Sequence, residues 1–101
     1  MRKGVLEYCI LLFLKDNELY PSEIILKLKE SKLIVVEGTL YPLLTRLKNA
    51  GILTYRWEES NSGPPRKYYS LTPIGETFTS ELSATWSALE KAVSSAQKKS
   101  K

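Results

Sequence analysis

Histidine is absent from this sequence of 101 residues, and cysteine occurs only once, as Cys9. Zinc sites of the Cys/His type need several such ligands, so a single chain cannot build one. A Ser-His-Asp or Cys-His catalytic arrangement is excluded for the same reason. The sequence also lacks a Gly-rich phosphate-binding loop, and its eleven acidic residues are scattered. We therefore expect a protein that is not an enzyme and that uses no metal or other cofactor.

Long apolar runs are missing as well. No segment reaches 18 consecutive apolar residues, which predicts that the chain has no membrane span. The run from Val5 to Leu14 is interrupted by Glu7 and lacks a small-residue cleavage site, so it does not read as a signal peptide. The apolar neighbours of Cys9 predict a buried thiol rather than a disulfide. These features favour a cytoplasmic protein.

Hydrophobic residues make up 43% of the chain, which is enough to build one folded domain. The net charge of +4 is unevenly distributed: residues 1–37 carry none of it, residues 38–75 carry +3 and residues 76–101 carry +1. A basic segment suits a polyanionic partner, but many soluble domains are mildly basic for solubility alone. The charge therefore becomes informative only once a scaffold is known.

Apolar periodicity predicts three helices in the first half of the chain. Residues 2–15 carry an apolar arc wider than that of a surface helix, which indicates a largely buried helix. Pro21 begins a second helix, because proline is favoured at the first helical position. Gly51 is placed to end the third helix in the left-handed conformation. The apolar stripe of this third helix consists of Leu40, Leu43, Leu44, Leu47 and Ala50.

The apolar period then changes from 3.6 to 2. Residues 53–58 and 66–71 alternate between apolar and polar side chains, which predicts a two-stranded hairpin. Residues 59–65 are rich in turn-forming residues and predict a long hairpin tip. Thr72 and Pro73 are typical of a helix N-cap followed by the first helical residue.

The last predicted helix, residues 73–97, is long for a chain of this size. Its apolar residues recur at steps of three and four, which approximates a coiled-coil seam. At about 1.5 Å per residue the helix spans roughly 35 Å, so its far half extends beyond three short helices. We expect a dimerisation helix, and packing within the chain is the alternative. Residues 98–101 are expected to form a basic, disordered tail.

Three helices followed by a hairpin is the order of a winged helix-turn-helix. The predicted fold is thus mostly α with a small β-hairpin: residues 1–72 form the winged helix-turn-helix, and the long C-terminal dimerisation helix follows. In this arrangement the third helix enters the major groove of DNA and the hairpin lies along the neighbouring backbone. These two elements coincide with the basic segment, so two independent observations indicate one surface.

Two motifs carry a resemblance to a known family. They are EGTLYPLL at 37–44 with RL at 46–47 and GIL at 51–53, and GPPRKYY at 63–69 with LT at 71–72 and Gly75. They resemble the recognition helix and the wing of PadR-type transcriptional regulators, and the resemblance covers nearly the whole chain. It is closest to the short subfamily, in which a single C-terminal helix forms the dimer.

The chain departs from this family at two places. The family usually has His-Gly-Tyr-Glu-Ile at the start of the second helix, where this chain has YPSEI at residues 20–24. This departure puts the phosphate contacts of the second helix in doubt. Val36 stands where a serine often caps the recognition helix, and the missing cap costs about 1 kcal/mol without threatening the fold.

The residues expected to contact DNA lie on the third helix and on the wing. Four of them are off the apolar stripe of the third helix: Thr39, Tyr41, Thr45 and Lys48. On the wing, two prolines stiffen the loop before Arg66 and Lys67, which favours phosphate binding. Because strand residues alternate, one of the two is expected to face DNA and the other the inner side of the sheet, with Arg66 preferred and Lys67 second. Arg46 either contacts DNA or pairs with an acidic residue. Tyr68 and Tyr69 are expected to pack within the fold.

The dimer interface is expected at four apolar positions of the last helix: Phe78, Leu82, Leu89 and Val93. The resemblance to the multidrug-binding branch of the family implies that Trp86 contacts flat aromatic ligands at the dimer axis. Glu90 would then favour cationic compounds, and Tyr8 and Glu7 would line the same space. Two alternatives stay open, namely that Trp86 only packs in the interface and that Tyr8 fills the space.

Together these expectations describe a homodimer that binds double-stranded DNA at a pseudo-palindromic operator and represses transcription until a small aromatic inducer binds. One alternative is a winged helix that binds other proteins without specific DNA binding. Another is a small-molecule carrier or adventitious enzyme at the dimer pore.

Overall fold

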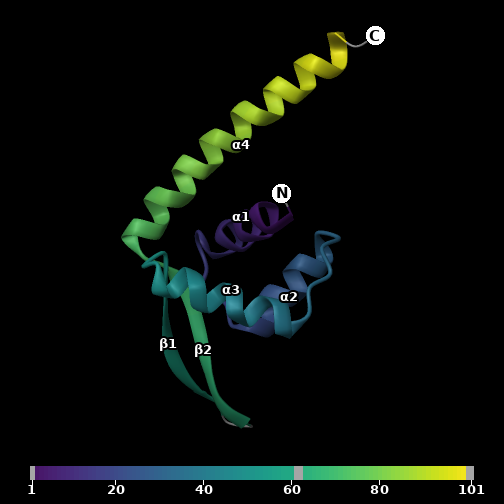
Figure 1. Cartoon of the computed structure of the whole chain (residues 1–101). Coiled ribbons are helices and arrows are strands. Elements are labelled where there is room, and N and C mark those ends of the chain that lie inside the picture. Colours follow the sequence, from purple (N-terminus) through teal and green to yellow (C-terminus); the bar gives the residue numbers. More distant parts are fainter. Residues whose placement is uncertain (1, 61–62, 100–101) are drawn as a thin grey trace.

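The computed structural model describes residues 2–60 and 63–99. In this part of the chain the elements follow in the order α1 (Arg2–Leu14), α2 (Pro21–Glu30), α3 (Glu37–Asn49), β1 (Leu53–Ser60), β2 (Gly63–Leu71) and α4 (Pro73–Lys99) (Figure 1). The fold is mostly helical with one antiparallel hairpin, which confirms the predicted class. Within the described residues, no helix is both long enough and apolar enough to cross a membrane.

The core is built around α1, which contacts α2, α4 and β2. Ile10 and Leu11 are fully buried and Leu14 is nearly so, because three elements cover this helix. The leucines of the predicted α3 stripe are also buried, which confirms the inward face of that helix. Cys9 is only partly buried, so the expectation of a buried thiol is correct only in part, and this burial raises the pKa of the thiol.

The hairpin, called the wing below, is longer than predicted. The two strands take up most of residues 59–65, which were expected to form a loop. Pro64 and Pro65 are compatible with β2, because each strand of a two-stranded ribbon has one edge without a strand partner. Residues 61–62 of the expected tip lie outside the described residues.

The wing is fastened to the helical body by the connection between α1 and α2. Leu19 and Tyr69 exchange two backbone hydrogen bonds, of 3.1 Å from Leu19 N–H and 2.8 Å from Tyr69 N–H. This short bridge adds a second line of backbone pairing to β2, beside its pairing with β1. It therefore sets the direction in which the hairpin leaves the body.

The junction between the wing and α4 is closely packed. Gly75 N–H donates to Thr72 Oγ1 at 2.9 Å, and Pro73 is the first helical residue, which confirms the predicted cap. Gly51 has a φ of +80°, as predicted for the end of α3. The Thr72 hydroxyl also contacts the carbonyl of Gly51, and Gly75 lies directly against the carbonyl of Ile52. The start of α4 is thereby fixed to the end of the third helix.

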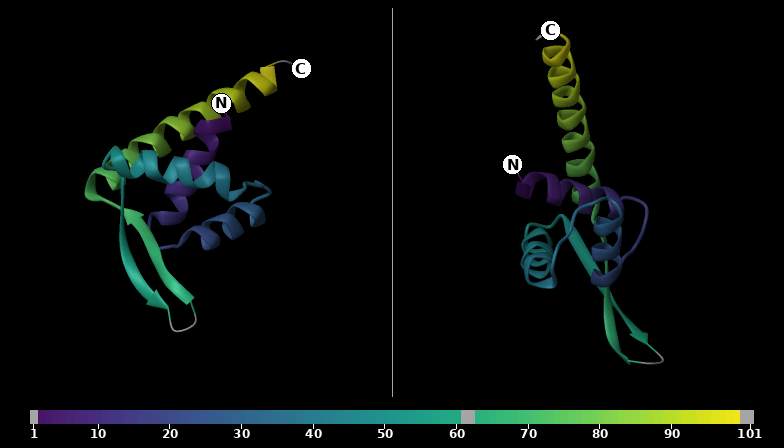
Figure 2. Two further views of the ribbon diagram at one scale, coloured as in Figure 1. Left: turned by 60° about the horizontal axis from the view of Figure 1, so that its bottom comes forward. Right: turned by 90° about the vertical axis from the view of Figure 1, so that its right-hand side faces the viewer.

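α4 leaves the body at the end opposite to the tip of the wing (Figure 2). Its 27 residues give the molecule a length of 58 Å against widths of 27 and 21 Å. The helix continues to Lys99, so the expected disordered tail from residue 98 is wrong for Lys98 and Lys99. Residues 100–101 lie outside the described residues.

Gly75→Ala tests the packing of the junction. A Cβ at this position would lie 2.0 Å from the Ile52 carbonyl oxygen, and backbone cannot move aside as cheaply as a side chain. We expect a loss of stability of about 3 kcal/mol, visible as a fall in Tm of more than about 10 °C. Gly4→Ala on α1 is the control, because its Cβ would meet nothing within 4 Å. Equal melting temperatures for the two variants would contradict the close contact.

Candidate nucleic-acid interface

The face of α3 opposite its buried leucines is open to solvent. Thr39, Tyr41, Thr45 and Lys48 are all exposed, as the sequence pattern predicts for groups that reach outward. Tyr41 retains 45% of its surface. At the helix start, Val36 is the N-cap and makes no side-chain capping hydrogen bond. The exposed face therefore offers hydroxyl groups, an aromatic ring and one ammonium group.

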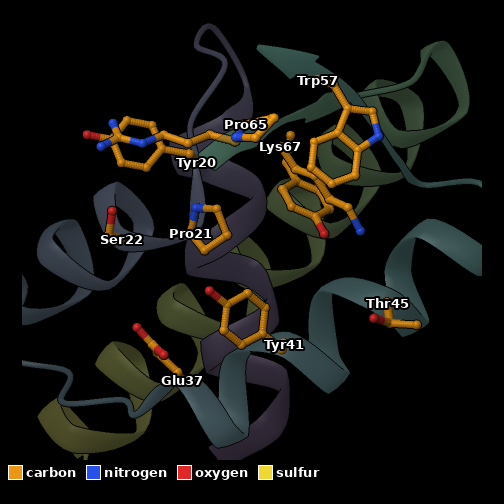
Figure 3. Close-up of a pocket in the computed structure, with 11 residues that line it drawn as sticks. Tyr20, Pro21, Ser22, Glu37, Tyr41, Thr45, Trp57, Pro65 and Lys67 are labelled. Atoms are coloured by element: carbon orange, nitrogen blue, oxygen red, sulfur yellow. The ribbon is translucent and has the colours of Figure 1, made fainter. Parts of the chain in front are cut away.

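A cleft of about 440 Å³ separates this face from the wing (Figure 3). Its walls come from the start of α2 and the residue before it, from α3 and from both strands. Tyr41 and Thr45 line it on the α3 side and Trp57 on the wing side. The remaining lining residues are Tyr20, Pro21, Ser22, Glu37, Pro65, Arg66, Lys67 and Tyr69.

Two of the five cations in the basic segment are paired with carboxylates. Arg46 forms an ion pair with Glu7 of α1, which decides the alternative left open for this residue. Arg56 donates to both carboxylate oxygens of Glu18, at 2.8 and 3.0 Å, and also pairs with Glu58. These hydrogen bonds lower the pKa of the Glu18 carboxyl and raise the pKa of Arg56. Both arginines are thus largely neutralised within the chain.

The other three cations lie on aromatic rings without a carboxylate partner among the described residues, whereas Arg56 has both its carboxylates and the Tyr68 ring, at 5.1 Å. Lys48 Nζ is 5.8 Å from the centre of the Tyr55 ring, and Lys67 Nζ is 4.5 Å from the same ring. Lys67 also lies 5.2 Å from the ring of Trp57, its cross-strand neighbour. The Arg66 guanidinium lies 4.5 Å from the Tyr20 ring.

Contact with an aromatic face restrains a cation without cancelling its charge, because the ring has no net charge. Among the described residues, no carboxylate forms an ion pair with Lys48, Arg66 or Lys67. The structure therefore brings the three unpaired cations of the segment together along the wing and the adjoining end of α3. These are the three cations that sequence reasoning selected.

Sequence reasoning missed the aromatic residues that hold these cations. Tyr55 and Trp57 alternate with polar residues in β1, which was interpreted only as strand patterning. Tyr20 was noted only as a departure from the family pattern. The expected packing of Tyr69 is confirmed, since it is 5% exposed, and Tyr68 packs edge-on against Tyr20 at 5.3 Å.

The proposed dimer residues of α4 form a largely uncovered stripe. Phe78, Leu89 and Val93 retain 38%, 45% and 49% of their surface, whereas Leu82 packs in part against the core of its own chain. Packing within the chain therefore accounts in part for the burial of Leu82, one of the predicted interface residues. The rest of the stripe has no covering element among the described residues.

Tyr8 and Trp86 lie together, a contact that fits both the expected ligand site and the alternative in which Tyr8 fills the space. Their rings stack in parallel, with centres 5.6 Å apart and planes 1° apart. The Tyr8 hydroxyl donates to Ser83 Oγ at 3.1 Å, which ties the Tyr8 side chain to α4. Glu90 is exposed one turn further along α4. Glu7 pairs with Arg46 and so is directed to α3 rather than to this aromatic pair.

Comparison with known proteins agrees with this geometry. Residues 10–81 match the transcriptional regulator PadR-like family. A PadR-like transcription factor from Bacteroides fragilis is 61% identical, with a TM-score of 0.85 over 95% of this chain and 93% of that one. A PadR-like transcriptional regulator from Bacillus cereus is 35% identical, also with a TM-score of 0.85, over 96% and 95% of the two chains. An uncharacterised protein of Lysinibacillus sphaericus is 26% identical over 90% of this chain and 86% of its own length.

The matched segment begins within α1 and ends within α4, so it contains α3, the wing and the cleft between them. Members of this family are transcriptional regulators and not enzymes. The chain therefore belongs to the PadR-like family of transcriptional regulators.

Proposed function

We propose that this regulator binds double-stranded DNA with α3 in the major groove and the wing against the adjacent backbone. The observation that carries the proposal is the division of the basic segment into paired and unpaired cations. Within the described residues Arg46 and Arg56 have carboxylate partners, whereas Lys48, Arg66 and Lys67 have none. Arg66 and Lys67 line the cleft, and Lys48 shares the Tyr55 ring with Lys67. Unpaired cations that are already restrained suit phosphate binding, which releases counterions from the DNA.

The exposed face of α3 supplies the groups that would read the sequence. Tyr41 can place its ring on a deoxyribose or a thymine methyl group and donate its hydroxyl to a phosphate. Thr39 and Thr45 lie within reach of base edges or phosphates from the same face. We assign Thr39, Tyr41, Thr45 and Lys48 to the helix contact and Arg66 and Lys67 to the wing contact.

The regulator is proposed to act as a homodimer through α4. Its apolar stripe extends past the body, and uncovered leucine, valine and phenylalanine side chains are the groups that a second copy would bury. Two recognition helices about 34 Å apart, one turn of DNA, would then match a pseudo-palindromic operator. Occupation of a promoter by this dimer would repress transcription.

A second proposed function is the binding of a planar aromatic inducer at Trp86. It is favoured by the parallel stack with Tyr8, because the indole already acts as a stacking platform. Glu90, one turn away, would attract a cationic compound. Such a ligand changes DNA affinity only if it prefers one dimer geometry over another.

Lys48→Gln and Arg46→Gln form a matched test of the DNA proposal, since each removes one positive charge. For Lys48→Gln we expect weaker binding and a slope of log Kd against log salt reduced by about 0.9, the value for one phosphate contact. For Arg46→Gln the slope should stay unchanged, because Glu7 already pairs with this arginine. Fluorescence anisotropy on a labelled duplex, read between 50 and 200 mM salt, measures both. Equal slopes in the two variants would exclude the assigned role of Lys48. If the parent chain itself does not bind the duplex at low salt, the alternative of a protein-interaction module is favoured.

Val93→Asp tests the dimer. Because burial of an unpaired carboxylate is costly, a charge on the uncovered stripe should convert dimers to monomers in sedimentation measurements. The loss of the dimer should in turn weaken operator binding. Ser95→Asp places the same charge two residues further, on another face of α4, and should leave the mass unchanged. If both variants stay dimeric, the interface lies elsewhere.

Trp57→Phe leaves Trp86 as the sole tryptophan and so permits a direct test of the ligand proposal. Titration with the planar cation proflavine should quench its fluorescence, and Glu90→Gln should weaken the apparent affinity, because the attraction between opposite charges is lost. Fluorescence that stays constant throughout the titration would rule out this cation as a ligand of Trp86.

A further inference from the structure

The contact between Tyr20 and Arg66 joins two parts of the fold that are separate in sequence. Arg66 is an exposed residue of β2, and Tyr20 is the residue that precedes α2. The guanidinium carbon lies 4.5 Å from the centre of the tyrosine ring, and both residues line the cleft between the wing and the helices. A side chain of the helical body thus holds a cation of the wing.

Tyr20 itself is firmly placed. Its N–H donates to Glu23 Oε1 at 3.1 Å, and its carbonyl accepts from the N–H groups of Glu23 and Ile24 at 2.9 and 3.2 Å. The ring packs edge-on against Tyr68, and the preceding residue, Leu19, makes the backbone bridge to β2. The ring is therefore a fixed platform whose position relative to the wing is set by neighbouring contacts.

Stacking leaves the hydrogen-bonding groups of Arg66 open. A guanidinium that lies face-on over an aromatic ring keeps its N–H groups in its own plane, where they can bind a phosphate with two parallel hydrogen bonds. No carboxylate forms an ion pair with Arg66 in the described parts of the chain. Arg56 shows that the two contacts are compatible, since its guanidinium lies 5.1 Å from the Tyr68 ring while its N–H groups bind Glu18 and Glu58.

We propose that Tyr20 is a positioning residue that presents Arg66 to a phosphate of the DNA backbone. The stack restricts the rotamers of a long side chain before DNA arrives, so less conformational entropy is lost on binding. The inference rests on the proposed DNA-binding function and adds a residue of the helical body to the wing contact.

A double-mutant cycle with Tyr20→Leu and Arg66→Gln tests this proposal. Binding is read by anisotropy on a mixed-sequence duplex of about three helical turns, because phosphate contacts do not depend on the operator sequence. We expect Tyr20→Leu to raise Kd about threefold when Arg66 is present, the size of an exposed cation–π contact. In the Arg66→Gln background, Tyr20→Leu should change Kd by less than its error.

Tyr20→Phe is the matched control, since it keeps the ring and should bind like the parent chain. Thermal melts of all variants show whether each is folded at the temperature of the binding measurement. Equal weakening by Tyr20→Leu in both backgrounds would overturn the positioning role, because a general disturbance of α2 acts without Arg66. If Arg66→Gln weakens binding and Tyr20→Leu does not, the positioning role fails while the DNA-binding proposal stands. If Arg66→Gln has no effect, the wing contact itself is wrong.

Discussion

Burial of α1 is the constraint on which the rest of the structure depends. Because α2, α4 and β2 all pack on this helix, its apolar face decides where the recognition helix, the wing and the long helix lie relative to one another. Two adjacent residues of α1 show how direct the connection is: Glu7 pairs with Arg46 on α3, and Tyr8 stacks on Trp86 of α4. The central helix therefore contacts both the proposed DNA-reading element and the proposed dimer element.

The wing depends on a second, smaller constraint. A two-stranded hairpin is only marginally stable alone, so its direction must come from the body. Residues 18–20 supply this through an ion pair, a backbone bridge and an aromatic contact, in that order: Glu18 with Arg56, Leu19 with Tyr69, and Tyr20 with Arg66. One short connection thus both aims the hairpin and arranges its cations.

The distribution of ion pairs gives the surface its character. Counting charges along the chain identifies a basic segment but treats its five cations as equivalent. In the folded chain acidic residues pair with two of them, Arg46 and Arg56, whereas the other three contact aromatic rings and have no carboxylate partner among the described residues. Aromatic contact is well suited to a polyanion-binding surface, because a carboxylate partner would first have to be displaced.

The sequence by itself determined the local features of this protein. Periodicity predicted the three short helices, the hairpin and the long helix, while Gly51 and Thr72 marked their ends, because helix and strand periods and caps depend on neighbouring residues. Only the tertiary structure decided which cations are free. Glu18 and Arg56 are 38 positions apart in the chain, and Tyr20 and Arg66 lie on different elements. Such partners meet only when helices pack, and periodicity specifies a face but not what lies opposite it.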